Sequence, residues 1–218
     1  MPRQFDLVVF DWDGTILDST ATIARSVQAA ASDLGLPVPS DERARHIIGL
    51  GLIDAMRHAL PDLPAERYPE VADRYRHHYL AQDSDLSLFE GIAGLVAELR
   101  DAGHLLAVAT GKSRRGLDRA FASSGLRDFF LASRCADECH SKPHPQMLEE
   151  LMAELGATPE RTLMIGDTTH DLQMARNAGV GAVAVTYGAH PRHDLLALDP
   201  LHCAETVGDL RAWLLAYA

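Results

Sequence analysis

Lysine is almost absent from this chain of 218 residues. Of its 20 basic residues only Lys112 and Lys142 are lysines, and arginine supplies the rest. A lysine ammonium group is a compact, strongly hydrated point charge with three donors, which the planar fork of arginine does not reproduce. Each of the two lysines therefore calls for a specific explanation.

Cysteine is also scarce. Cys135, Cys139 and Cys203 are odd in number and scattered, which fits a reducing cytosol better than a disulfide scaffold. Cys135 and Cys139 lie close to His140 and His144, but this spacing is not a usual zinc pattern. We therefore expect a cytoplasmic protein whose cysteines neither pair nor hold zinc.

The chain also has fewer basic than acidic residues, and it has no long apolar run. The net charge is −11, which argues against nucleic acid or an anionic membrane as a partner. No apolar run reaches the length of a membrane span, and residues 1–6 lack the apolar region of a signal peptide. With 47% hydrophobic residues, the chain has enough apolar material for a sizeable core.

Strands and helices alternate along most of the sequence. Short apolar runs predict strands at 7–10, 105–109, 129–132, 162–165 and 182–186. Amphipathic segments predict helices at 92–102, 113–124, 142–155, 168–178 and 210–217. This alternation indicates an α/β fold with a doubly wound parallel sheet.

Residues 18–85 interrupt this alternation, because they contain helical patterns only. Helices are predicted at 18–34, 40–48, 52–60 and 65–81, with Pro and Gly between them. We therefore expect a core domain formed by residues 1–17 and 86–218, and a small all-helical cap domain formed by residues 18–85.

Two carboxylates follow the first predicted strand. Leu7–Phe10 is apolar throughout, and Asp11 ends it. Asp11 and Asp13 share one side of the chain, roughly 7 Å apart, while Trp12 points the other way into packing. Gly14 allows a sharp turn. The pair could bind a hard cation, act as nucleophile and proton donor, do both, or form a solvated turn.

Other polar residues follow the neighbouring strands. Thr110-Gly111 and Gly166-Asp167 end two of them, and in a parallel sheet these ends meet at one edge. Asp11, Asp167 and Asp171 suit Mg²⁺. Lys142 could reach the same edge and complete a phosphate cradle. Lys112, in contrast, is expected to be a solvated residue at a helix start.

Four short motifs now occur in order along the chain: Asp11-Trp12-Asp13-Gly14-Thr15, Thr110-Gly111, Lys142-Pro143, and Gly166-Asp167-Thr168-Thr169-His170-Asp171. With them the sequence resembles the haloacid dehalogenase-like (HAD) superfamily. Within that superfamily it is most similar to the phosphoglycolate phosphatase-like hydrolases, which carry a helical cap inserted after the first strand.

The resemblance implies a phosphatase and a role for each motif residue. Asp11 is expected to be the nucleophile that forms a phosphoaspartate, and Asp13 the acid and base that serves the leaving group and then the attacking water. The implied catalytic set also includes Thr110 and Lys142. The implied phosphate-binding groups are Asp11, Gly14, Thr110, Gly111 and Lys142, and the implied Mg²⁺ ligands are Asp11, Asp13 through its main-chain carbonyl, Asp167 and Asp171.

The cap is expected to select the substrate, a small phosphorylated metabolite. Gly49 and Leu50 lie in a loop that resembles the specificity loop of the family. Arg45 and Arg57 are either partners for a second anionic group, as in phosphoglycolate, or plain surface charges. Nucleoside monophosphates, pyrophosphate, sugar phosphates and a β-phosphoglucomutase-like phosphotransfer stay open, as does the choice between monomer and homodimer.

Two other classes of protein fit the sequence less well. A dinucleotide-dependent oxidoreductase needs Gly-x-Gly-x-x-Gly after the first strand, where this chain has Asp11-Trp12-Asp13-Gly14-Thr15. A binding module without activity is expected to have lost a motif residue, and all of them are present.

Overall fold

A computed structural model describes residues 4–218 and contains a six-stranded sheet in which every strand is parallel to its neighbours. The strand order is β3-β2-β1-β4-β5-β6. The strands are β1 (Leu7–Phe10), β2 (Leu105–Thr110), β3 (Ala132–Cys135), β4 (Thr162–Gly166), β5 (Gly181–Val185) and β6 (His202–Ala204). This arrangement confirms the predicted doubly wound α/β fold.

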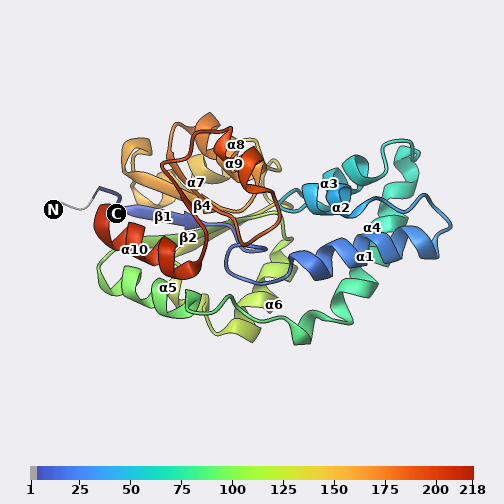
Figure 1. Cartoon of the computed structure of the whole chain (residues 1–218), viewed down its shortest axis with the longest axis horizontal. Coiled ribbons are helices and arrows are strands. Elements are labelled where there is room, and N and C mark those ends of the chain that lie inside the picture. Colours follow the sequence, from blue (N-terminus) through green and yellow to red (C-terminus); the bar gives the residue numbers. More distant parts are fainter. Residues whose placement is uncertain (1–3) are drawn as a thin grey trace.

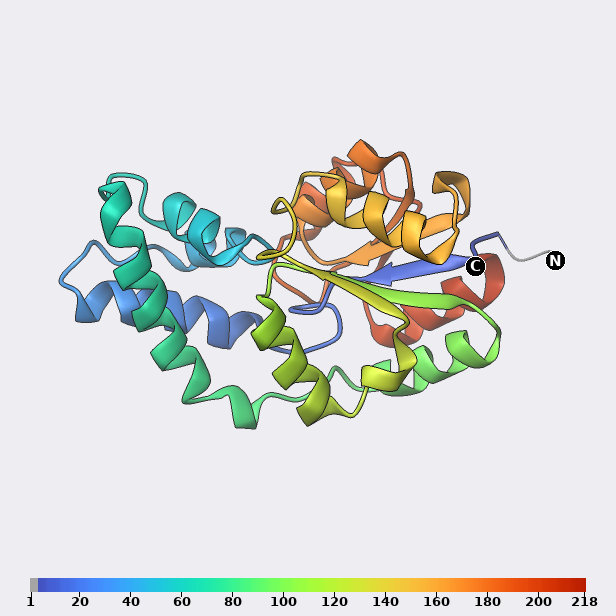
Figure 2. The same ribbon diagram turned by 180° about the vertical axis from the view of Figure 1, so that it is seen from behind.

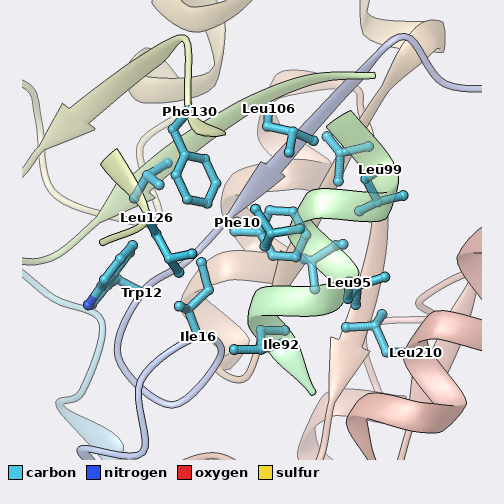
Figure 3. Packing of buried hydrophobic residues seen from close by; sticks show 14 of the residues in the cluster. Phe10, Trp12, Ile16, Ile92, Leu95, Leu99, Leu106, Leu126, Phe130 and Leu210 are labelled. Carbon is cyan, nitrogen blue, oxygen red and sulfur yellow. The ribbon is translucent and has the colours of Figure 1, made fainter. Parts of the chain in front are cut away.

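Helices cover both faces of the sheet (Figure 1). The helices of this layer structure are α5 (Ile92–Asp101), α6 (Arg114–Ser124), α7 (Gln146–Leu155), α8 (Thr169–Ala178), α9 (Arg192–Leu196) and α10 (Val207–Tyr217). Because side chains alternate along a strand, Phe10 of β1 packs on one face, as Figure 3 shows, and Val9 belongs to a separate cluster with α7 and α8. Every residue of β1 is buried, as expected of a central strand.

Trp12 lies in the core, as its position after Asp11 predicts. Its ring is fully buried, and its centroid lies 5.1 Å from that of Phe121 in an edge-to-face contact. Phe130 packs beside both (Figure 3). The packing fixes the backbone on either side of Trp12, and with it the two carboxylates that precede and follow this residue.

Residues 18–85, which the sequence predicts to form a cap, lie beyond the carboxyl ends of the strands (Figures 1 and 2). Their helices are α1 (Thr20–Asp33), α2 (Asp41–His46), α3 (Leu52–Ala59) and α4 (Tyr68–Leu80). They enclose a hydrophobic cluster of their own that includes Val27, Met56 and Val71. Within residues 4–218 no helix combines the length and the apolarity needed to cross a membrane.

Four details differ from the prediction. Strand β3 begins at Ala132 rather than at 129, because Arg127–Phe129 forms a 3₁₀ turn. Helix α7 begins at Gln146, four residues after Lys142. Helix α9 and strand β6 were not predicted, since segments of five and three residues show little periodicity. Residues 1–3 of the predicted core domain lie outside the described residues.

Candidate active site

Lys142 joins two carboxylates at the edge of the sheet. Its Nζ atom lies 2.6 Å from Oδ1 of Asp11, which follows β1, and 2.6 Å from Oδ1 of Asp171, in the first turn of α8. All three side chains are inaccessible to solvent or nearly so. The other oxygen of Asp171 accepts hydrogen bonds from the Thr168 amide and hydroxyl groups at 3.1 and 2.6 Å, so the start of α8 fixes this carboxylate.

Asp167 completes the group at the end of β4. Its Oδ1 accepts a hydrogen bond from the Thr15 hydroxyl at 3.1 Å, and its Oδ2 accepts one from the Ala189 amide at 2.7 Å. Gly14 and Gly188 pack directly on it, and a Cβ atom at either position would overlap the Asp167 carboxylate. Gly14 has a φ of 83°, which other residues rarely adopt. The backbone at Gly14 and Gly188 therefore packs directly against the Asp167 side chain.

The three carboxylates fit a divalent cation. Ligand oxygens of Asp11, Asp167 and Asp171 lie within 4.8 Å of one another, and all three residues are buried. Oδ2 of Asp11 is buried with no hydrogen-bond partner among the described residues. Burial raises the pKa of Asp11 to about 7 although Lys142 opposes the shift, and burial together with Asp11 raises the pKa of Asp167. A hard cation such as Mg²⁺ would stabilise these oxygens in their charged form.

Asp13 lies apart from this group and faces the cap. Its Oδ1 accepts a hydrogen bond from the Ser19 hydroxyl at 2.6 Å and lies 2.9 Å from Nζ of Lys112. The expectation that Lys112 is solvated is wrong, because its side chain is only 10% exposed. Burial acts to lower the pKa of Lys112, but Asp13 and two tyrosines of the cap outweigh it and raise this pKa.

Thr110 and Gly111 lie where β2 meets the cap. Thr110 is buried, and its hydroxyl oxygen accepts a hydrogen bond from the Lys112 amide at 3.2 Å. A Cβ atom at Gly111 would lie 2.5 Å from the carbonyl oxygen of Gly49 and 2.6 Å from that of Leu50. The predicted specificity loop therefore rests directly on Gly111, and only a glycine leaves room for it.

Further contacts hold the same loop against the core. The Gly51 amide donates to the Ser141 hydroxyl at 2.7 Å. The carbonyl oxygen of His46 lies 2.8 Å from Nε2 of His170 and 3.1 Å from Nε2 of His190. Nδ1 of His190 accepts from the Thr169 amide at 3.0 Å, which leaves Nε2 to donate. These contacts hold the loop that follows α2 against the edge of the sheet.

A cavity of about 830 Å³ remains between the cap and the core. Asp13, Gly111 and Lys112 line its inner end, and Gly49 and Leu50 line the cap side. Arg45 and Arg57 are not among the residues that line it. They form ion pairs within their own helices, with Asp41 at 2.8 Å and with Asp54 at 2.9 Å.

Sequence reasoning missed the residues that connect cap and core. Lys112, Tyr79 and Ser141 are in this class, together with His46 and His190. The rarity of lysine was the one available signal for Lys112. The others carry no local pattern, because their role depends on how the cap is oriented.

Comparison with known proteins agrees with this geometry. Residues 8–185 match the family model described as haloacid dehalogenase-like hydrolase. The chain belongs to this family of hydrolases, as its four motifs predict, and it is similar to phosphoglycolate phosphatases.

The relatives cover nearly the whole chain. The chain is 36% identical over 211 residues to "Probable phosphatase IndB" of Dickeya dadantii, which covers 94% of this chain and 91% of that protein. It is 32% identical over 225 residues to phosphoglycolate phosphatase of Aliivibrio fischeri, and this match covers 99% of this chain and 97% of that protein. The crystal structure of a predicted phosphatase from Clostridium acetobutylicum shares the fold, with a TM-score of 0.86, 24% identity, and coverage of 97% of this chain and 99% of that one.

Proposed function

We propose that this protein is a Mg²⁺-dependent phosphatase that hydrolyses a small phosphomonoester through a phosphoaspartate on Asp11. One observation carries the proposal. Asp11 is held by Lys142 through Oδ1, while its Oδ2 is buried without a hydrogen-bond partner among the described residues. A carboxylate with one oriented and one unused oxygen is suited to bind a cation and attack phosphorus.

Two steps account for the reaction. A carboxylate oxygen of Asp11 attacks the phosphoryl group, the bond from phosphorus to the ester oxygen breaks, and a proton from Asp13 goes to the leaving alcohol. Water, deprotonated by Asp13, then attacks phosphorus, and the bond from phosphorus to Asp11 breaks to release phosphate. A bound Mg²⁺ supplies charge neutralisation for the phosphoryl oxygens and for the carboxylates.

The remaining residues orient the phosphoryl group. We assign the Thr110 hydroxyl, the Gly111 amide and Lys142 to its oxygens, with Gly14 at the turn beside them. Asp167 is assigned to direct metal binding, the Asp13 carbonyl to a further ligand position, and Asp171 to binding through water or to orientation of Lys142. These roles are supported by the closeness of the carboxylates and of Lys142.

The relatives and the cavity support a proposal for the substrate. A small phosphorylated acid such as phosphoglycolate is our first candidate, and nucleoside monophosphates, pyrophosphate and sugar phosphates are the alternatives. A mutase would need a bisphosphate activator, which steady-state assays reveal. A cytoplasmic location and a monomeric or homodimeric state remain predictions.

The test is hydrolysis of p-nitrophenyl phosphate with Mg²⁺ and with EDTA. Asp11→Asn should abolish activity, whereas Asp18→Asn, a matched change at an exposed position, should retain it. A metal fluoride complex should bind at the Asp11 carboxylate in a crystal structure. Full activity of Asp11→Asn, or activity that EDTA leaves unchanged, would refute the proposal.

A further inference from the structure

Three basic residues in and just before α6 line the cavity: Lys112, Arg115 and Arg119. Lys112 precedes the helix and lies beside Asp13. Arg115 and Arg119 lie four residues apart within α6, which places them on one side of the helix. With a rise of about 1.5 Å per residue, Arg119 lies roughly 6 Å beyond Arg115 along the helix.

The two arginines differ from the other charged residues around the cavity. Each lining carboxylate has a partner: Asp13 pairs with Lys112, Asp54 with Arg57 and Asp73 with Arg76, and Asp137 accepts a hydrogen bond from the Arg114 amide. Arg115 and Arg119 have no ion-pair partner within residues 4–218. The four acidic and four basic residues that line the cavity balance in charge. In a chain with a net charge of −11, the two arginines without an ion pair on one wall nevertheless favour an anionic ligand.

Residues 47–56 contribute an apolar stretch to the cap side of the same cavity, with Ile47, Leu50, Leu52, Ile53 and Met56 lining it. The charged cap residues in the lining are Asp54, Asp73 and Arg76. A ligand that fits between the two walls has an apolar body and an anionic group directed toward α6. Arg45 and Arg57, which the sequence allows either as partners of such a group or as surface charges, pair within their own helices and do not line the cavity. Arg115 and Arg119 do line it.

We propose that Arg115 and Arg119 bind a second anionic group of the substrate, separated from the scissile phosphoryl group by an apolar spacer. This inference rests on the proposed phosphatase activity and narrows its substrates. They are phosphomonoesters whose leaving group ends in a carboxylate or a phosphate. Phosphoglycolate has no such spacer, so this inference favours longer esters over that first candidate.

Two esters test the inference, phenyl phosphate and 4-carboxyphenyl phosphate, which differ only in a carboxylate across the ring. Wild-type protein should prefer the carboxylated ester in kcat/KM by about tenfold, the effect of one or two charge-assisted hydrogen bonds. In the double variant Arg115→Gln/Arg119→Gln the ratio should fall toward one, and in Arg119→Glu it should invert. Arg176→Gln, an exposed arginine of α8 outside the cavity lining, should keep the wild-type ratio.

The outcomes separate this inference from the proposed function. Hydrolysis of both esters at equal efficiency by the wild-type protein would overturn the inference and leave the phosphatase intact. A preference that survives in the double variant would overturn it as well. Absence of Mg²⁺-dependent hydrolysis of either ester would overturn the proposed function, and the inference with it.

Discussion

The ammonium group of Lys112 lies 2.9 Å from Oδ1 of Asp13 in the core and donates to the hydroxyl of Tyr79 in the cap at 3.0 Å. One side chain therefore connects the proposed acid and base to helix α4. The ring of Tyr75 stacks on that of Tyr79, with 5.8 Å between centroids, and burial raises the pKa of Tyr79 to about 12. The hydroxyl stays protonated at neutral pH and accepts from the lysine.

Replacing Lys112 by Met should lower kcat/KM for p-nitrophenyl phosphate by about 10- to 100-fold, because it leaves the buried Asp13 carboxylate without its ion partner. We expect most of the loss in kcat, since Lys112 orients the group that moves the proton. Tyr79→Phe is the companion variant, which removes the cap hydroxyl but keeps the ion pair, and it should lose only about threefold. Steady-state kinetics that are normal in Lys112→Met would contradict this role.

A methyl group at Gly111 should keep the cap from closing. The added Cβ atom would meet the carbonyl oxygens of Gly49 and Leu50, and such overpacking costs about 1–3 kcal/mol. We expect kcat/KM of Gly111→Ala to fall by roughly tenfold or more, in line with that cost. The radius of gyration from small-angle X-ray scattering should rise slightly.

Gly94→Ala is the matched control for this change. Gly94 lies within α5 and has no neighbouring atom within 4 Å of an added Cβ. Alanine there should be neutral or should stabilise the helix by up to about 1 kcal/mol. Equal kinetics for both alanine variants would show that the loop does not press on Gly111 during turnover.

Ser141 should contribute to cap closure through its contact with Gly51. Ser141→Ala removes the acceptor for the Gly51 amide, a loss of about 1 kcal/mol. Because this bond joins the loop of the cap to the core beside the proposed site, we expect KM to rise about fivefold with little change in thermal stability. Ser123→Ala, which removes a hydroxyl that bonds only within α6, should leave KM unchanged, and an unchanged KM in Ser141→Ala would exclude the contact from the closing step.

The sequence predicts the catalytic edge better than the boundary with the cap. Asp11, Thr110 and Asp167 could be placed because each ends or follows a strand, and the carboxyl ends of parallel strands meet at one edge of the sheet whatever the loops do. Lys142 followed from its position before a helix. These residues therefore lie close together because of the sheet topology. That topology can be predicted because the hydrophobic periodicity of each segment identifies it as a strand or a helix.

The contacts of the cap could not be predicted in the same way. Lys112 meets Tyr79 only because α4 lies over the start of α6, and Arg115 and Arg119 gain a role only because the cap leaves a cavity in front of them. No period in residues 18–85 encodes that orientation. Arg45 and Arg57 could be either partners of a second anion or surface charges for the same reason, since nearness in sequence to the loop does not determine the direction of their side chains, and neither lines the cavity.

The stabilising effect of Mg²⁺ should grow with pH. Without metal, burial raises the pKa of Asp11 from 3.8 to about 7, so between these values the folded protein binds more protons than the unfolded chain and loses stability as pH rises. Mg²⁺ competes with those protons, and the rise in Tm that it causes should be larger at about pH 8 than at about pH 5. Asp167→Asn should abolish the rise in Tm at both pH values, and the control Asp18→Asn should preserve it. A rise in Tm that does not depend on pH would place the metal away from Asp11.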